Sequence, residues 1–176
     1  MAAWLQTVGG ALPIPDSGVL LPHEHLFLDL RGPEAPGYAR ADPEAVLVTM
    51  RPYLQDIKDR GVVGLVECST VGVGRNVRVL SRLAEATGLA IVAPTGVYAE
   101  PAAPRSVLAM SERELEDWLT QEIEGSIEGT AVRAGFIKVA SSPDGLTAFE
   151  RRVLRAAARV AQTSVFSDQQ RFRHAD

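Results

Sequence analysis

Apolar runs of strand length alternate with amphipathic stretches of helix length along most of this chain. Four of these runs are bounded by turn residues and show no regular alternation between apolar and polar positions. They span residues 20–28, 62–68, 90–95 and 134–140. Continuous apolar runs of this kind are typical of parallel strands that are covered by helices. The pattern therefore predicts an α/β fold in which four parallel strands are each followed by a helix.

Helix-start signals stand between these strands. They are an Asp-Pro-Glu sequence at 42–44 and two capping boxes, at 111–114 and at 147–150. The predicted helices span residues 43–60, 75–87, 111–127 and 147–162. Before the first strand, residues 4–20 alternate short apolar stretches with turn-forming residues, which predicts a small β-hairpin.

The composition is that of a globular protein, with 46% hydrophobic and 23% charged residues. A net charge of −4 and a sequence pI near 5.4 argue against general binding of nucleic acid or of anionic membranes. The N-terminus lacks a signal-peptide pattern, and no apolar run approaches the ~18–20 residues that span a bilayer. Cys68 is the single cysteine, so no intramolecular disulfide can form. We therefore expect a cytoplasmic protein.

The first strand carries two histidines, His23 and His25, at alternate positions. Because side chains alternate across a strand, both imidazoles are expected on one face, about 6–7 Å apart along it, while Glu24 faces the other way. Two imidazoles that converge at a strand end can chelate a metal such as Zn²⁺. The alternative is a pair of histidines that bond to backbone or water.

Lys138 stands inside the fourth apolar run, where a charged side chain is costly. Burial lowers the pKa of a lysine toward the neutral amine, which can act as a nucleophile, form a Schiff base or take up CO₂ as a carbamate. A carbamate is a carboxylate and can bridge two metal ions. The alternative is that Lys138 lies at the strand end and extends its ammonium group into water.

Four sequence blocks together resemble the phosphotriesterase family of the amidohydrolase superfamily. They appear in the order of that family and are more specific than the His-Glu-His sequence alone. The blocks are Thr7-Val8-Gly9-Gly10 with Gly18-Val19-Leu20-Leu21-Pro22-His23-Glu24-His25-Leu26, then Gly72-Val73-Gly74-Arg75-Asn76, Thr95-Gly96-Val97-Tyr98 and Ala134-Gly135-Phe136-Ile137-Lys138-Val139-Ala140.

The resemblance implies a TIM (β/α)₈ barrel with two divalent metal ions, usually zinc, at the carboxyl ends of its strands. His23 and His25 match the first-strand ligands of one metal, and Lys138 matches the carbamylated lysine that bridges both metals. Tyr98 matches a tyrosine near the substrate pocket of the lactonase branch. The implied reaction is metal-assisted hydrolysis of lactones, carboxylic or amide-type esters, or phosphotriesters, which are small-molecule substrates.

The resemblance ends near Thr163, whereas a complete barrel takes about 250 residues or more. The family's later metal ligands, two histidines and an aspartate on later strands, have no counterpart in the sequence. The remaining histidine, His174, lies in a polar segment without periodicity. We therefore expect a partial barrel over 1–163, made of the first four βα units and the hairpin, followed by a divergent, disordered tail over 164–176.

Two functions follow from these expectations. The first is a zinc-dependent hydrolase of the phosphotriesterase type, truncated so that it binds at most one ion weakly and has negligible activity alone. The second is a non-catalytic half-barrel that is unstable or that associates with another chain, including itself, through its open strand edges. A doubly wound binding module is disfavoured because no glycine-rich phosphate loop opens the first helix.

Overall fold

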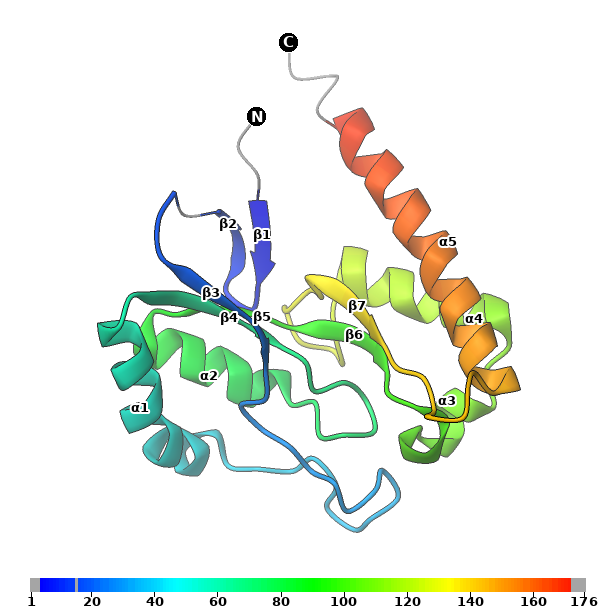
Figure 1. Cartoon of the computed structure of the whole chain (residues 1–176), viewed down its shortest axis with the longest axis horizontal. Helices are drawn as coiled ribbons and strands as arrows, with labels where there is room; N and C mark the ends of the chain where they lie inside the picture. Colours follow the sequence, from blue (N-terminus) through cyan, green and yellow to red (C-terminus); the bar gives the residue numbers. More distant parts are fainter. Residues whose placement is uncertain (1–3, 15, 172–176) are drawn as a thin grey trace.

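A computed structural model describes residues 4–14 and 16–171 of the chain, and it describes the side chains of these residues except 165–171 (Figure 1). The N-terminal strands β1 (Trp4–Thr7) and β2 (Gly10–Pro13) pair antiparallel. They form the hairpin that the alternation of apolar stretches and turn residues predicts. Val8, at the turn, donates its N–H to the carbonyl of Ile91 at 2.8 Å and so fixes the hairpin to the main sheet.

The strands after the hairpin pair only in parallel within the described residues, as the sequence predicts. The first sheet has the order β3-β4-β5 and the second has the order β6-β7. Their bounds are Val19–Glu24 for β3, Val62–Glu67 for β4, Ala90–Val92 for β5, Pro94–Val97 for β6 and Phe136–Val139 for β7. The first strand ends at Glu24, before the predicted end near residue 28, so His25 lies just beyond it.

The expected third strand, over 90–95, is divided in two at Ala93. The carbonyl of Ala93 accepts the N–H of Gly135 at 2.8 Å, and the next residue, Pro94, has no N–H to give to a ladder. The chain changes partner at this point: β5 pairs with β4, whereas β6 pairs with β7. The two short sheets are therefore joined by the covalent chain at Ala93 and by a parallel bridge between Val71, after β4, and Val97 of β6.

The predicted capping signals are present at the helix starts. Asp42 accepts the N–H of Glu44 before α1 (Pro43–Asp59), and Ser111 forms a capping box with Glu114 before α4 (Glu112–Thr120). Helix α2 spans Val77–Thr87. A π-helical turn, η2 (Gln121–Gly125), continues α4, and the short helices η1 (Glu100–Ala102) and α3 (Arg105–Leu108) lie between β6 and α4.

Helix α5 (Ala148–Arg171) extends past its predicted end near residue 162. The expectation of an irregular tail from residue 164 is therefore wrong for the backbone of 164–171. An established helix gains one hydrogen bond for each residue that it adds, and the Gln and Arg residues of this segment are good helix formers, so polarity does not end it. His174 and the other residues after 171 lie outside the described part of the chain, and the divergence of the tail stays a prediction.

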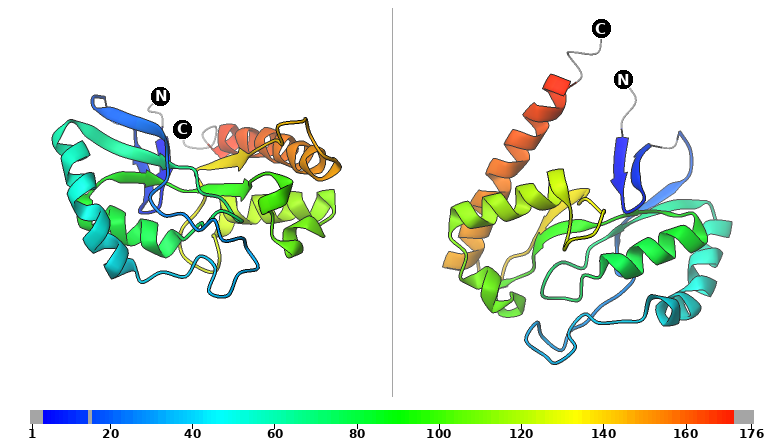
Figure 2. Two further views of the ribbon diagram at one scale, coloured as in Figure 1. Left: turned by 60° about the horizontal axis from the view of Figure 1, so that its bottom comes forward. Right: turned by 180° about the vertical axis from the view of Figure 1, so that it is seen from behind.

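The helices cover the sheets in two groups. Helices α1 and α2 pack together along one side of β3-β4-β5, while α4 and α5 pack together beside β6-β7 (Figures 1 and 2). Each group has its own cluster of buried apolar side chains, around Leu80 and Leu83 in the first and around Leu115 and Leu119 in the second. The two outermost parallel strands are poorly covered: neither β3 nor β7 has a fully buried residue.

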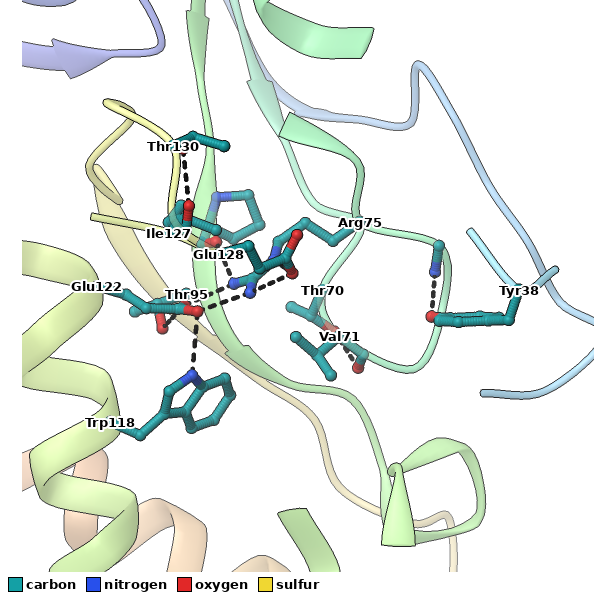
Figure 3. Close-up of polar contacts among 12 residues, drawn as sticks. Tyr38, Thr70, Val71, Arg75, Thr95, Trp118, Glu122, Ile127, Glu128 and Thr130 are labelled. Atoms are coloured by element: carbon teal, nitrogen blue, oxygen red, sulfur yellow. Dashed lines mark hydrogen bonds and ion pairs between the residues drawn. The ribbon is translucent and has the colours of Figure 1, made fainter. Parts of the chain in front are cut away.

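A buried ion pair connects the two groups (Figure 3). Arg75, in the loop after β4, donates two hydrogen bonds to the carboxylate of Glu122, at 2.6 and 2.7 Å. The side chains are 1% and 4% exposed. Arg75 also donates to the carbonyl of Pro94 at 3.2 Å, at the start of β6. The guanidinium therefore holds the loop after β4, the start of β6 and the π-helical turn together.

Further hydrogen bonds and charges offset the cost of burying each charge of this ion pair. Burial opposes the charged form of Arg75, but the hydrogen bonds and charges of Glu122 and Glu128 together outweigh it, so the pKa of Arg75 is raised. Glu122 also accepts from the Thr95 hydroxyl at 2.6 Å and from the Trp118 indole N–H at 3.0 Å. A buried charge costs little only while its partners remain, so removal of one partner is expected to be costly.

We predict that Arg75→Met lowers the free energy of unfolding by about 3–5 kcal/mol, because it leaves the Glu122 carboxylate buried without its cation. Urea denaturation measures the loss. The control is Arg60→Met, which removes a solvent-screened, exposed ion pair with Asp56 on α1 and should lower the free energy of unfolding far less. Equal losses in the two variants would contradict a connecting role for Arg75.

Glu150 is a second buried carboxylate, at the start of α5. It accepts from the Ser142 hydroxyl at 2.7 Å, and from the N–H groups of Ser142, Thr147 and Glu100 at 3.0–3.1 Å. The Ser142 hydroxyl and the backbone donors favour the charged form and lower the pKa of Glu150 to about 2. Glu150 therefore fixes the loops after β6 and β7 to α5.

The lowered pKa of Glu150 predicts how the free energy of unfolding depends on pH. The stabilisation by Glu150 is complete above the pKa of about 4.5 of the unfolded chain and is lost as the pH falls toward about 2. We expect the unfolding free energy of the wild type to fall more steeply over this interval than that of Glu150→Gln. Urea denaturation at several pH values tests this. Parallel pH profiles for the two proteins would show that Glu150 has no lowered pKa.

Candidate metal centre

The carboxyl ends of the parallel strands share one edge of the fold. In Figure 1 the loops that follow β3, β4, β6 and β7 lie in the lower half of the view, on the side away from the N-terminal hairpin. Parallel strands place successive loops at one edge, and this edge is where α/β proteins carry their functional residues. The residues that the sequence singles out belong to these strand ends.

His23 and His25 are adjacent at the end of β3. Their ring centroids lie 5.3 Å apart with an angle of 62° between the ring planes, and both residues are exposed. The His25 side chain is 37% exposed, so one part of the ring is accessible while another part contacts protein. The side-by-side arrangement follows from the alternation of side chains along the strand. Their role as metal ligands stays a prediction.

Two residues that the sequence analysis missed, Glu67 and Ser69, surround the inner side of His25. The Nδ1 of His25 lies 3.0 Å from the Ser69 hydroxyl and 3.8 Å from Oε1 of Glu67. Glu67 is 1% exposed and accepts the N–H groups of Leu26 at 2.6 Å and of Ser69 at 2.8 Å. The sequence feature that could have pointed to Glu67 is its position as a glutamate at the end of the second apolar run.

Lys138 lies in β7 opposite Gly96 of β6 and is half-buried. Gly96 has a φ of 104°, and a Cβ there would overlap the carbonyl of Lys138, so only glycine allows this close pairing. Burial raises the pKa of the Cys68 thiol, and the charge of Lys138 acts in the opposite direction. The Lys138 ammonium is therefore within electrostatic reach of Cys68, the residue that follows β4.

Tyr98 follows β6 directly and is 45% exposed. It thus stands at the edge that carries the histidines, although the structure gives no contact between them. Among the side chains described, those of residues 4–14 and 16–164, no group of three or more His, Cys, Asp or Glu is arranged to hold a metal ion. The donors present, two imidazoles and one lysine, fit part of a metal centre. Lys138 joins them as a ligand only after carbamylation.

A model of the phosphotriesterase family matches residues 3–165. The chain belongs to the phosphotriesterase family. An aryldialkylphosphatase from Saccharolobus solfataricus is 33% identical over 148 residues, which cover 81% of this chain and 46% of the relative. An N-acetyltaurine hydrolase from Bos taurus is 31% identical over 188 residues, which cover 92% of this chain and 54% of the relative.

Solved structures lead to the same family assignment as these relatives. A mutant of a phosphotriesterase-like lactonase from Deinococcus radiodurans superimposes with a TM-score of 0.80 at 34% identity, over 90% of this chain and 52% of that one. The α/β fold with parallel strands is therefore that of the family. The chain spans about half the length of the relatives that it matches.

Two other properties of the described residues bear on function. No helix in this part of the chain is long and apolar enough to cross a membrane. One surface hollow lies between the hairpin and α2, lined by residues such as Val8, Leu12 and Ala84. It lacks the His and Lys side chains discussed above, so we assign the chemistry to the strand ends instead.

Proposed function

We propose that this chain supplies the N-terminal half of the active site of a metal-dependent hydrolase. In this proposal β3, β4, β5 with β6, and β7 are the first four strands of a (β/α)₈ barrel, with zinc as the principal candidate metal. The observation that carries it is the pair of exposed imidazoles, 5.3 Å apart, at the carboxyl end of β3. Membership of the phosphotriesterase family supports the reaction class.

Each site residue has one role in this proposal. His23 and His25 would hold one metal ion, and Lys138, once carbamylated, would supply a carboxylate ligand. A metal bound there would supply Lewis-acid chemistry, which is polarisation of the substrate oxygen and a lowered pKa of a water molecule. Tyr98, exposed after β6, orients the substrate at the same edge. The described residues would therefore bind and orient, but they offer too few donors to hold two ions.

The remaining ligands must come from outside the described residues. The outer strands β3 and β7 have no fully buried residue, so both sheet edges are open for further strands. Either a second polypeptide segment completes the barrel, or the chain is the non-catalytic half-barrel and self-associates through these edges.

The substrate class of the proposed hydrolase is a small ester, lactone, phosphotriester or amide. The names of the relatives span an aryldialkylphosphatase, a lactonase and an N-acetyltaurine hydrolase, so the family membership does not favour one of these bonds. The net charge of −4 supports a small-molecule substrate over nucleic acid or an anionic membrane. The cytoplasmic location stays a prediction.

We predict that the purified chain binds at most one Zn²⁺ ion, weakly, and that His23→Ala abolishes this binding. Isothermal titration calorimetry measures the stoichiometry and the affinity. The matched control is His174→Ala, which removes the only histidine outside the His23 and His25 pair and should leave binding unchanged. Zinc binding that survives His23→Ala would contradict the assigned site.

We also predict negligible lactonase, esterase and phosphotriesterase turnover by the chain alone, because its donors do not complete a two-metal site. Hydrolysis of chromogenic substrates with added zinc measures this. Metal-dependent turnover well above the reaction without enzyme, lost in Lys138→Ala, would overturn the half-site interpretation. That result would show that the chain, alone or self-associated, forms a complete site.

A further inference from the structure

We infer that Glu67 and Ser69 are positioning residues for His25: they hold its ring with the proton on Nδ1 and so present Nε2 to the metal. This inference rests on the proposed function for the identity of the ligand, but the state of the ring is a property of the metal-free protein. The supporting residues come from β4 and the loop after it, whereas His25 follows β3.

The first step is the position of the carboxylate. Glu67 is 1% exposed, and each of its two oxygens accepts one backbone N–H, from Leu26 and from Ser69. Leu26 is the residue after His25, so the carboxylate fixes the backbone from which the imidazole projects. The parallel strands also meet through the N–H of Cys68, which donates to the carbonyl of Glu24 at 2.8 Å. Glu67 is therefore not the sole link between the two strand ends.

The second step is the choice of tautomer. The Ser69 hydroxyl, 3.0 Å from Nδ1, can accept from a protonated Nδ1 or donate to an unprotonated one. Oε1 of Glu67 lies 3.8 Å from the same nitrogen. Unlike the hydroxyl, this carboxylate oxygen carries negative charge and has no proton to donate. A lone pair on Nδ1 would face this buried carboxylate, whereas an N–H there is attracted to it. The carboxylate thus decides that Nδ1–H donates to Ser69.

The third step is the consequence for ligation. With the proton on Nδ1, the free lone pair of His25 is on Nε2, on the side of the ring away from Glu67 and Ser69. A carboxylate that fixes the second nitrogen of a ligating histidine also raises the basicity of the first. The rings of His23 and His25 are adjacent, but no hydrogen bond to the His23 ring occurs among the described residues. Only His25 is held in this way.

Nitrogen NMR of the imidazole rings in the metal-free protein at pH 8 tests the inference, because each ring nitrogen shows whether it carries a proton. We expect His25 to be mainly the Nδ1–H tautomer. In Glu67→Gln, which keeps the side-chain shape and removes the charge, the Nε2–H form should become the major one. His23 in the same samples is the control and should not change. If Glu67 only stabilised the fold, Glu67→Gln would change the tautomer of neither His25 nor His23.

Ser69→Ala keeps the backbone N–H that binds Glu67 and serves as the second variant if Glu67→Gln does not fold. It should lower the Nδ1–H population of His25 to a smaller extent. A wild-type His25 with its proton on Nε2, or an unchanged tautomer in a folded variant of either kind, would overturn the inference.

Zinc titration separates this inference from the proposed function. If both hold, Glu67→Gln raises the zinc dissociation constant by about 10-fold or more while the stoichiometry stays the same. A wild-type chain that binds no zinc but shows the expected tautomers would refute the proposed metal centre and leave the positioning of His25 intact. Zinc binding with unaltered tautomers in folded Glu67→Gln would refute the positioning of His25 and leave the proposed metal centre intact.

Discussion

The arrangement of the strand ends depends on the buried ion pair between Arg75 and Glu122. The sheet order passes from β5 to β6 through Ala93, where pairing changes partner. A parallel bridge between Val71, after β4, and Val97 of β6 connects the two sheets through the backbone. Arg75 adds a buried side-chain connection through its bonds to Glu122 and to the carbonyl of Pro94. It therefore helps to hold the sheet that carries Lys138 against the sheet that carries His23.

The candidate site is built by the same kind of interaction on a smaller scale. A buried carboxylate, Glu67, satisfies the N–H groups that the chain leaves unpaired where β3 and β4 end, and its charge faces His25. Buried charges are stable only with their partners in place, which makes such contacts specific as well as costly to remove. The exposed imidazole edge is available for a metal because the opposite edge is held.

Local signals in the sequence predict most of the fold and little of the site's support. Apolar runs and capping boxes depend on neighbouring residues, so the parallel strands and the helix starts at Asp42 and Ser111 are predictable. The break at Ala93 and the roles of Glu67 and Arg75 depend on partners more than 40 residues away, which no periodicity reveals. The extension of α5 past residue 162 shows that polarity alone does not end a helix.

The central claim is that the end of β3 presents two imidazoles as the first ligands of a metal centre. A crystal structure of the chain grown with zinc tests it most directly. The account predicts a zinc ion about 2.0–2.1 Å from Nε2 of His23 and from Nε2 of His25, with Nδ1 of His25 still bonded to Ser69. Zinc bound elsewhere on the chain, or through Nδ1 of His25, would contradict it.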